Sequence, residues 1–303
     1  MGTLKNTLTR IVGEGNVLCD EPMSQHTTFR IGGPADFFVV PQSIDALCAA
    51  IGAVREAGVP LYLIGRGSNL LVSDAGLRGA VVQVSTNLSS VAIGDDGYVC
   101  AEAGATNAKI AAEACKAGFG GFEFAAGIPG TVGGAAIMNA GAYDGEFKDV
   151  AVEVTCLDTN GSKVVLTPDE AQWGYRSSAI ATRELIVLSV KLKLHPEDPS
   201  KIQARIDELA KRRIDKQPLD KPSAGSTFKR PPGLFAGKLI QDAGMQGYRI
   251  GGAEVSTKHA GFVVNVGDAS ADDVMQVIRD VQSVVLDKFD VLLEPEVRMW
   301  GFE

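Results

Sequence analysis

The chain's most suggestive chemical feature is a glycine-rich stretch that begins at Phe124 and reads FAAGIPGTVGGAAIMNAGAY. It contains five glycines and one proline, and no charged side chain precedes Asp144. Because glycine costs conformational entropy, such density requires a reason. One reason is a backbone that presents its N–H groups to phosphate oxygens. A second such stretch, IGRGSNLL, spans Ile64–Leu71. Together they indicate one large phosphate-bearing ligand held by main chain, with tight turns between packed elements as the alternative.

Three polar residues lie in settings where a polar side chain needs an explanation. Arg176 lies between aromatic and small residues in WGYRSSA, and Ser226 lies between a glycine and a basic pair in PSAGSTFKRPPG. Glu296 lies in VLLEPEVRMW, opposite an apolar face made by Val291, Leu293, Val297 and Met299. Each is a catalytic candidate with an ordinary alternative: a surface ion pair for the arginine, a turn for the serine and a solvated strand face for the glutamate.

Charge and motif content exclude several function classes. The formal net charge of −8 argues against nucleic acid or an anionic membrane as a partner. A basic segment from Lys211 to Lys238 nevertheless suits a small anionic substrate, or else a solvated helix end. His26, His195 and His259 are too scattered to predict a metal site. No nucleophile elbow, HExxH or GxxxxGKS motif is present, which argues against hydrolases and kinases.

The cysteines and the N-terminal residues indicate the expected cellular compartment. The five cysteines show no CxxC spacing and are interpreted as small core residues in a reducing compartment. The opening MGTLKNTLTRIVG has no apolar signal region, and no stretch approaches the roughly 18 apolar residues of a membrane span. We therefore expect a cytoplasmic protein with no membrane insertion.

The first part of the chain follows a strand–helix–strand pattern. Phe37–Val40 is a predicted strand, Ser43 caps a predicted helix that ends at Gly58, and Leu61–Ile64 is the next strand. The following GRGSNL resembles a dinucleotide fingerprint, but Leu70 occupies the third glycine position. A conventional Rossmann NAD site is therefore not expected.

Further elements follow on both sides of a connector. The expected strands are Ala80–Val84, Tyr98–Ala103, Ala151–Leu157, Lys163–Leu166, Leu185–Leu194, Phe262–Val266 and Val291–Trp300. The expected helices run from Thr106 or Asn107 to Gly118, from Ser200 to Arg213 and from Ser270 to about Lys288. The polar connector His195–Pro199 is the best domain boundary, and residues 217–235 form a long loop expected to carry function. The pattern predicts two mixed α/β or α+β units.

Seven motifs in order identify a family resemblance. They are TTFRIGGPADFFVVP at Thr27–Pro41, IGRGSNLL, GIPGTVGGAAIMNAGAY, GYRSSA, AGSTFKRP, KHAGFVVN at Lys258–Asn265 and LEPEVR at Leu293–Arg298. Together they closely resemble the UDP-N-acetylenolpyruvoylglucosamine reductase family of bacterial peptidoglycan precursor synthesis, from about Thr27 to Arg298. Met245-Gln246 departs from a Leu-Lys-like pair, which concerns only a local contact.

The resemblance implies a domain plan and a reaction. It implies an FAD-binding domain over residues 1–196, with a fold of the vanillyl-alcohol oxidase type and two α+β subdomains. A smaller α+β substrate domain would follow over residues 197–303. Non-covalent FAD would be reduced by NADPH and would then reduce the enolpyruvyl group of a UDP-sugar to lactyl. The length resembles the shorter class of the family, which lacks a substrate-capping tyrosine loop.

The resemblance also assigns roles to residues. Arg176 and Glu296 would hold and polarise the substrate carboxylate, and Ser226 would deliver a proton to the α-carbon. The FAD contacts would be Gly65, Arg66, Gly67, Ser68, Asn69, Leu70, Gly127, Ile128, Pro129, Gly130, Thr131, Gly133, Gly134, Asn139, Ala140, Gly141 and Ala142. Lys229, Arg230 and Lys238 would meet the substrate diphosphate.

Two other functions remain open. An FAD oxidase or dehydrogenase on the same cofactor fold would explain the glycine stretches, but it would leave Arg176, Ser226 and Glu296 without a shared purpose. A non-catalytic flavin or nucleotide-sugar binding module would bind ligand without turnover. No obligate protein partner is evident from the sequence.

Overall fold

A computed structural model describes residues 2–302, which fold into two compact units of mixed α/β structure. Unit 1 comprises residues up to Leu18, Phe37–Arg66 and Ala80–Arg213. Unit 2 comprises Cys19–Asp36, Gly67–Gly79 and the residues from Ile214 onward. Each unit has its own cluster of buried apolar side chains. Among the described residues, no helix is both long and apolar enough to cross a membrane.

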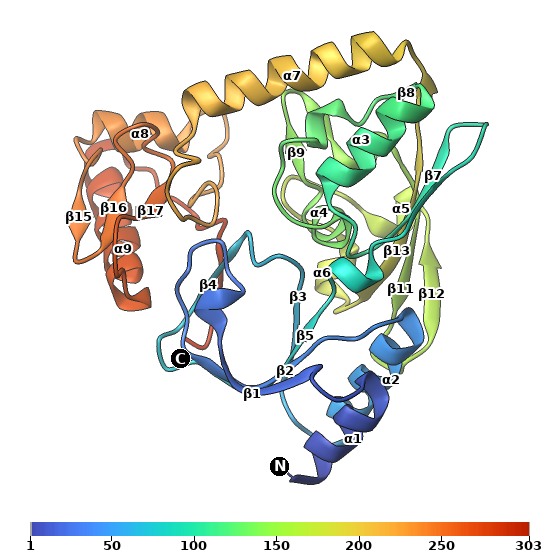
Figure 1. Ribbon diagram of the computed structural model, residues 1–303. Coiled ribbons are helices and arrows are strands. Elements are labelled where there is room, and N and C mark those ends of the chain that lie inside the picture. The colour runs from blue at the N-terminus through green and yellow to red at the C-terminus, as the bar shows by residue number, and fades with distance from the viewer. Residues whose placement is uncertain (1, 303) are drawn as a thin grey trace. The chain divides into compact units, whose positions relative to one another are not determined.

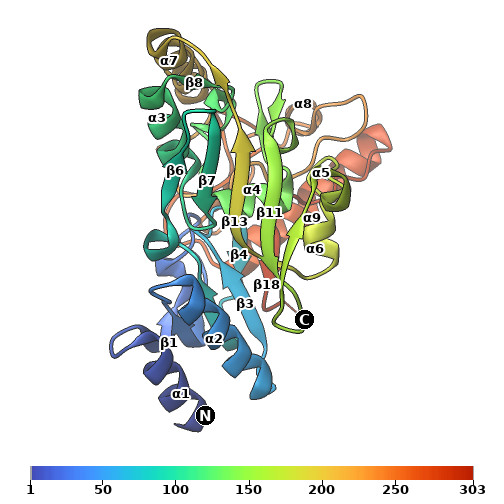
Figure 2. The same cartoon turned by 90° about the vertical axis from the view of Figure 1, so that its right-hand side faces the viewer.

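The largest sheet of unit 1 has five antiparallel strands, which Figure 2 shows side by side. Its order is β12 (Lys163–Leu166), β11 (Ala151–Leu157), β13 (Ile186–Lys193), β7 (Tyr98–Glu102) and β6 (Val91–Ile93). The helices α3 (Asn107–Ala117) and α4 (Val132–Met138) pack on this sheet, and α5 (Pro168–Ala171) and α6 (Ala179–Thr182) follow β12. The glycine-rich stretch therefore contains a short helix that packs on a sheet.

The remaining elements of unit 1 include a parallel strand pair. In it, β3 (Leu61–Ile64) pairs with β5 (Leu77–Gln83) in a sheet of order β1-β2-β5-β3. Ser43 caps α2 (Ile44–Glu56) by accepting a hydrogen bond from the Ala46 N–H, as predicted. The other elements of unit 1 are α1 (Gly2–Val12), β8 (Phe119–Gly120), β9 (Gly141–Ala142), β10 (Gly145–Glu146) and β14 (His195–Pro196). The residues of β1 (Val17–Pro22), β2 (Pro34–Val39), β5 and α7 (Pro199–Lys216) are divided between the two units.

Unit 2 packs a small sheet against a long helix, as Figure 1 shows. The sheet has the order β15 (Arg249–Ile250), β16 (Ala253–Val255) and β17 (Val263–Asn265). The helices are α8 (Ala236–Asp242) and α9 (Ala271–Phe289), and β4 (Leu70–Val72) pairs in parallel with β18 (Arg298–Trp300). The apolar face of α9 is buried, with Val274, Val277, Ile278, Val281 and Val285 at most 1% exposed.

The structure corrects two sequence-based predictions. The strand predicted over Val291–Trp300 is wrong in extent, because only Arg298–Trp300 forms a regular strand. Pro295 interrupts the segment, since proline has no N–H to donate to a ladder. Cys100 is exposed, as is Cys19, so the interpretation of the cysteines as core residues holds only for Cys115 and Cys156.

Residues 217–235, all within the described part of the chain, form neither helix nor strand, so the predicted long loop is confirmed. The predicted domain boundary at 196/197 stays a prediction. The helix α7 begins just after it, and its residues up to Arg213 belong to unit 1.

The N-terminal cap of α9 provides a test of local stability. The Ser270 hydroxyl accepts a hydrogen bond from the Asp273 N–H, and Asp273 completes a capping box. Ser270→Ala should lower the free energy of unfolding by about 0.5–2 kcal/mol, because it leaves that N–H without its acceptor. Urea unfolding followed by circular dichroism measures this loss. Ser283→Ala, at an exposed position inside α9, is the matched control and should not destabilise. Equal stabilities for the two variants would refute the capping role.

Candidate functional site

The glycine-rich stretch of unit 1 is built around the N-terminus of α4. Thr131 caps this helix by accepting a hydrogen bond from the Gly134 N–H. Gly133 is buried, and a Cβ there would lie 2.9 Å from the Ala103 Cβ, which is closer than carbon atoms approach. Position 133 requires glycine because α4 packs closely against Ala103. The sequence left close packing as the alternative to ligand binding, and close packing explains the glycine at position 133.

The two glycine stretches meet at Thr131. A Cβ on Gly65, just after β3, would lie 2.7 Å from the Thr131 hydroxyl oxygen. Gly134 is different, because it is exposed and the nearest atom to a Cβ there would be 3.9 Å away. The protein's own packing does not require glycine at 134. An open backbone face at a helix N-terminus suits close approach by a phosphate group.

A buried polar atom lies beside the same stretch. Asn107 is 1% exposed and donates from Nδ2 to the Ile128 carbonyl oxygen at 3.3 Å. Its Oδ1 is buried and has no hydrogen-bond partner among the described residues. Buried polar groups are normally satisfied, so an orphaned acceptor here suits a ligand or water that supplies a donor. The residues present therefore fit a bound cofactor in this part of unit 1.

Sequence reasoning did not single out Arg213 as a site residue. A Cβ on Gly127 would lie 3.3 Å from the Arg213 Cδ, so the arginine lies against the glycine stretch. Burial lowers the pKa of the Arg213 guanidinium. A half-buried cation beside this glycine stretch is a candidate ligand for an anion. The available signal was its place in the basic segment from Lys211 to Lys238.

The second half of the IGRGSNLL stretch belongs to unit 2. Gly67 has a φ of +60°, and a Cβ there would lie 2.1 Å from the His26 carbonyl oxygen. Only glycine fits both constraints. Asn69 then donates from Nδ2 to the Glu296 carbonyl oxygen at 3.2 Å, and its own carbonyl accepts from the Arg298 N–H at 2.9 Å. A predicted cofactor residue thus lies beside a predicted catalytic residue.

Thr227 brings the segments of Ser226 and Glu296 together. Its N–H donates to the Gly261 carbonyl at 2.8 Å, and its carbonyl accepts from the Glu296 N–H at 2.8 Å. Its hydroxyl accepts from the buried Val263 N–H at 2.9 Å. Thr227 is 1% exposed, whereas Ser226 is exposed and Glu296 is partly exposed. The buried Thr227 therefore joins the backbone next to the exposed Ser226 to the backbone of the partly exposed Glu296.

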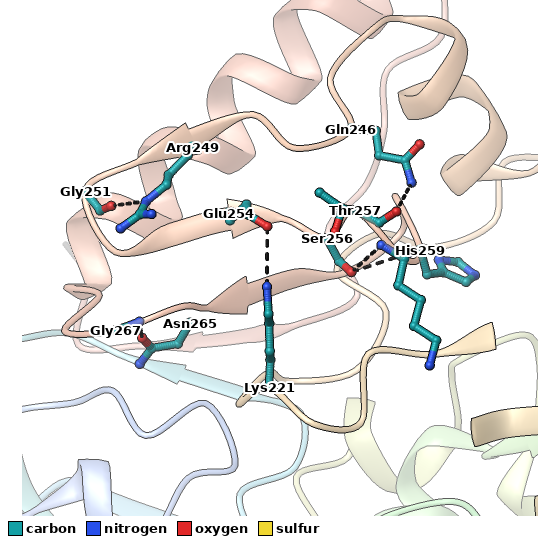
Figure 3. A network of polar contacts seen from close by, with 11 residues as sticks. Lys221, Gln246, Arg249, Gly251, Glu254, Ser256, Thr257, His259, Asn265 and Gly267 are labelled. Atoms are coloured by element: carbon teal, nitrogen blue, oxygen red, sulfur yellow. Dashed lines mark hydrogen bonds and ion pairs between the residues drawn. The ribbon is translucent and has the colours of Figure 1, made fainter. Parts of the chain in front are cut away.

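The KHAGFVVN motif forms the turn that supports Thr227, and Figure 3 shows its polar contacts. The Ser256 hydroxyl accepts from the N–H groups of Lys258 and His259, and the Gln246 amide donates to the Thr257 carbonyl at 2.7 Å. His259 Nδ1 accepts from the Gly261 N–H at 3.0 Å. Burial lowers the pKa of His259, which favours the neutral ring that can accept this bond.

Arg176 belongs to unit 1, on a turn closed by a bridge between Gly174 and Ser177. Its φ of +52° is unusual for a residue with a side chain. The guanidinium donates to the Gly141 carbonyl at 3.4 Å, and its Cζ lies 5.0 Å from the centre of the Tyr175 ring. Non-glycine residues in this conformation concentrate at functional sites, which fits a catalytic role for Arg176.

The three residues predicted to meet a diphosphate all lie in unit 2. Lys229 forms an ion pair with Glu294, and Lys238 forms one with Asp242 on α8. The Arg230 guanidinium lies 4.5 Å from the centre of the exposed Phe235 ring. Both lysines are thus engaged by carboxylates, and their role toward substrate stays a prediction.

Comparisons with known proteins match two regions of the chain. Residues 35–167 match the family model described as an FAD binding domain. Residues 217–300 match the model described as UDP-N-acetylenolpyruvoylglucosamine reductase, C-terminal domain. The chain is 47% identical to the UDP-N-acetylenolpyruvoylglucosamine reductase of Agathobacter rectalis, over 99% of this chain and 98% of the relative. It is 48% identical to that of Caldanaerobacter subterraneus, over 98% of each chain.

Solved structures give the same result. The crystal structure of UDP-N-acetylenolpyruvylglucosamine reductase from Thermus caldophilus matches with a TM-score of 0.80 and 34% identity, over 94% of this chain and 98% of that one. p-Cresol methylhydroxylase matches with a TM-score of 0.50 and 16% identity, over 65% of this chain and 43% of that one, which shows a shared fold alone. The extent and identity of these matches show that the chain belongs to the UDP-N-acetylenolpyruvoylglucosamine reductase family.

Proposed function

We propose that this protein is an NADPH-dependent flavoenzyme that reduces the enolpyruvyl ether of UDP-N-acetylglucosamine to UDP-N-acetylmuramate. Family membership over nearly the whole chain supports the reaction. The observation that carries the assignment of residues is the bonding of Thr227, which places the Ser226 and Glu296 segments side by side. We place the enzyme in the cytoplasm, where NADPH and sugar nucleotides are held.

FAD, when bound, would accept two electrons from NADPH and pass them to the substrate. The residues that would hold it in unit 1 are Gly65, Thr131, Gly134 and the Ile128 segment beside Asn107. The family resemblance of the GRGSNL motif supports Gly67–Asn69 as further contacts through backbone N–H groups. The open backbone at Gly134 and the orphaned Asn107 oxygen support this assignment.

The protein's own residues would stabilise charge on the substrate. Addition of a hydride equivalent to the methylene carbon places negative charge on the α-carbon and its carboxylate. Arg176 would hold this carboxylate, and Glu296 would hydrogen-bond to it as it becomes enol-like. Preorganised groups that face developing charge away from bulk water lower the barrier strongly. Ser226 would then donate its proton to the α-carbon, and solvent would restore the serine proton.

Serine is a very weak acid, so its placement is decisive. It can donate only to a strongly basic carbon and only from a fixed position. Gly225, with a φ of +78°, turns the chain just before Ser226, and Thr227 fixes the chain just after it. These two neighbours support the assignment of Ser226 as the proton donor.

The reaction is tested by an anaerobic absorbance measurement on the purified protein. The protein should be yellow, NADPH should bleach the flavin absorbance, and the enolpyruvyl UDP-sugar should restore it. Mass spectrometry should then detect the lactyl product. Bleached flavin that only oxygen restores would instead favour an oxidase or dehydrogenase. Flavin binding without bleaching would favour a non-catalytic binding module.

Replacement of Gly134 tests the cofactor cradle. Gly134→Ala adds a methyl group to an open helical position, so the apoprotein should gain about 0.5–1 kcal/mol of stability. If a phosphate approaches this backbone, the same methyl should weaken FAD binding about tenfold or more. Fluorescence titration of the apoprotein with FAD measures the affinity.

Gly52→Ala is the control for this test, because Gly52 is exposed within α2 and a Cβ there meets nothing within 4 Å. It should change stability in the same direction and leave the FAD affinity unaltered. Undiminished FAD affinity in Gly134→Ala would remove this position from the cradle.

Replacement of Ser226 separates the two half-reactions. Ser226→Ala should leave reduction of the flavin by NADPH nearly intact, because that step needs no proton on the substrate α-carbon. Recovery of the flavin absorbance with the enolpyruvyl substrate should slow by about 10²-fold or more, on the scale of general-acid effects. Stopped-flow absorbance measures both steps. Equal losses in the two steps would contradict a role as proton donor.

A further inference from the structure

A buried asparagine links the end of α4 to the Arg176 turn. Asn139 is 0% exposed, ends α4 with a φ of +43° and belongs to unit 1. Its Nδ2 donates to the Glu146 carboxylate at 3.0 Å and to the Gly174 carbonyl at 3.0 Å, while its Oδ1 accepts from the Lys148 N–H at 3.0 Å. Because both amide protons and the oxygen are engaged, the side chain acts as a structural link and has no free donor for a cofactor.

Glu146 is the charged member of this group. It lies on β10 directly opposite Gly141 on β9, in an antiparallel pair. Its carboxylate accepts from Asn139 and forms an ion pair with the Lys148 ammonium at 2.7 Å. The hydrogen bond from Lys148 is the largest cause that lowers the pKa of Glu146, and Arg176 contributes through its charge. Glu146 is therefore ionised at neutral pH and attracts the Arg176 guanidinium.

Arg176 is restrained at the same end of this hairpin. Its Nη2 donates to the Gly141 carbonyl, and Gly141 is the register partner of Glu146. The guanidinium is therefore bonded at the register position of Glu146, and Asn139 holds the turn that carries Arg176 by donating to the Gly174 carbonyl. A free arginine side chain has many rotamers, and fixing it before substrate arrives removes that entropy cost from catalysis.

We propose that Glu146, held by Asn139, is a positioning residue that orients the Arg176 guanidinium toward the substrate carboxylate. This role rests on the proposed function, because it requires Arg176 to act on that carboxylate. Glu146 itself touches no reacting atom. The Glu146 carboxylate fixes the direction of the Arg176 guanidinium. Removal of this carboxylate leaves Arg176 charged but no longer oriented. The sequence-based assignment of Asn139 as a cofactor contact stays a prediction, and its side chain takes the supporting role described here.

Glu146→Gln is the direct test, performed on the FAD-loaded enzyme by stopped-flow absorbance. Glutamine keeps an oxygen that can accept from Asn139 and loses the charge that attracts Arg176. Recovery of the flavin absorbance with the enolpyruvyl substrate should slow about tenfold, since misorientation of a fixed group costs of this order. Reduction by NADPH and the affinity for FAD should remain at the wild-type values. Glu153→Gln removes an exposed carboxylate of the same unit and should behave as wild type.

A second background distinguishes positioning from a general structural role. In an Arg176→Ala enzyme, Glu146→Gln should cause no further slowing, because the group that it orients is already absent. The same tenfold loss in that background would overturn the proposal, as would an unaffected single variant. A wild-type enzyme whose flavin the substrate does not reoxidise would instead overturn the proposed function, and this role with it.

Discussion

The bonding of the Thr227 peptide is the constraint on which the proposed chemistry depends. One buried residue donates to the Gly261 carbonyl, accepts from the Glu296 N–H and engages Val263 through its hydroxyl. Neither neighbouring segment forms a regular strand there. The loop and the chain end are held together by these bonds, by a bridge between Phe228 and Pro295 and by the Lys229 N–H, which donates to the Glu294 carbonyl at 2.8 Å. The proposed catalytic residues Ser226 and Glu296 therefore lie on irregular backbone that Thr227 ties to the buried core of unit 2. Binding and catalytic residues on loops held by a rigid scaffold are common in enzymes.

The glycines of the proposed cofactor region serve two distinct purposes. Gly65, Gly67 and Gly133 are required by the protein's own packing, because a Cβ at each would collide with a neighbouring atom. Gly134 has open space around it and no such requirement. The cradle thus combines positions fixed by close backbone packing with a position left open to a ligand. Glycine density in the sequence cannot distinguish these purposes, since both exclude a side chain.

Much of the fold could be predicted from local sequence signals. The caps at Ser43, Thr106 and Ser270 act within a few residues, so the sequence indicated their helices correctly. The strand predicted over Val291–Trp300 was too long, because alternation of apolar residues does not reveal whether a neighbour pairs with them. The helix α4 was missed because glycines mask its periodicity. Contacts between distant segments, such as the bond from Asn139 to the Gly174 carbonyl, have no local signal at all.

The central claim is that Ser226 and Glu296 act on one substrate as a unit, because Thr227 holds their segments together. The most direct measurement is the rate of flavin reoxidation by the enolpyruvyl UDP-sugar in Ser226→Ala, Glu296→Gln and the double variant. Residues that act as a unit give strongly non-additive losses. The account predicts that the double variant is about as slow as the slower single variant. Losses that multiply in the double variant would show independent action and contradict the account.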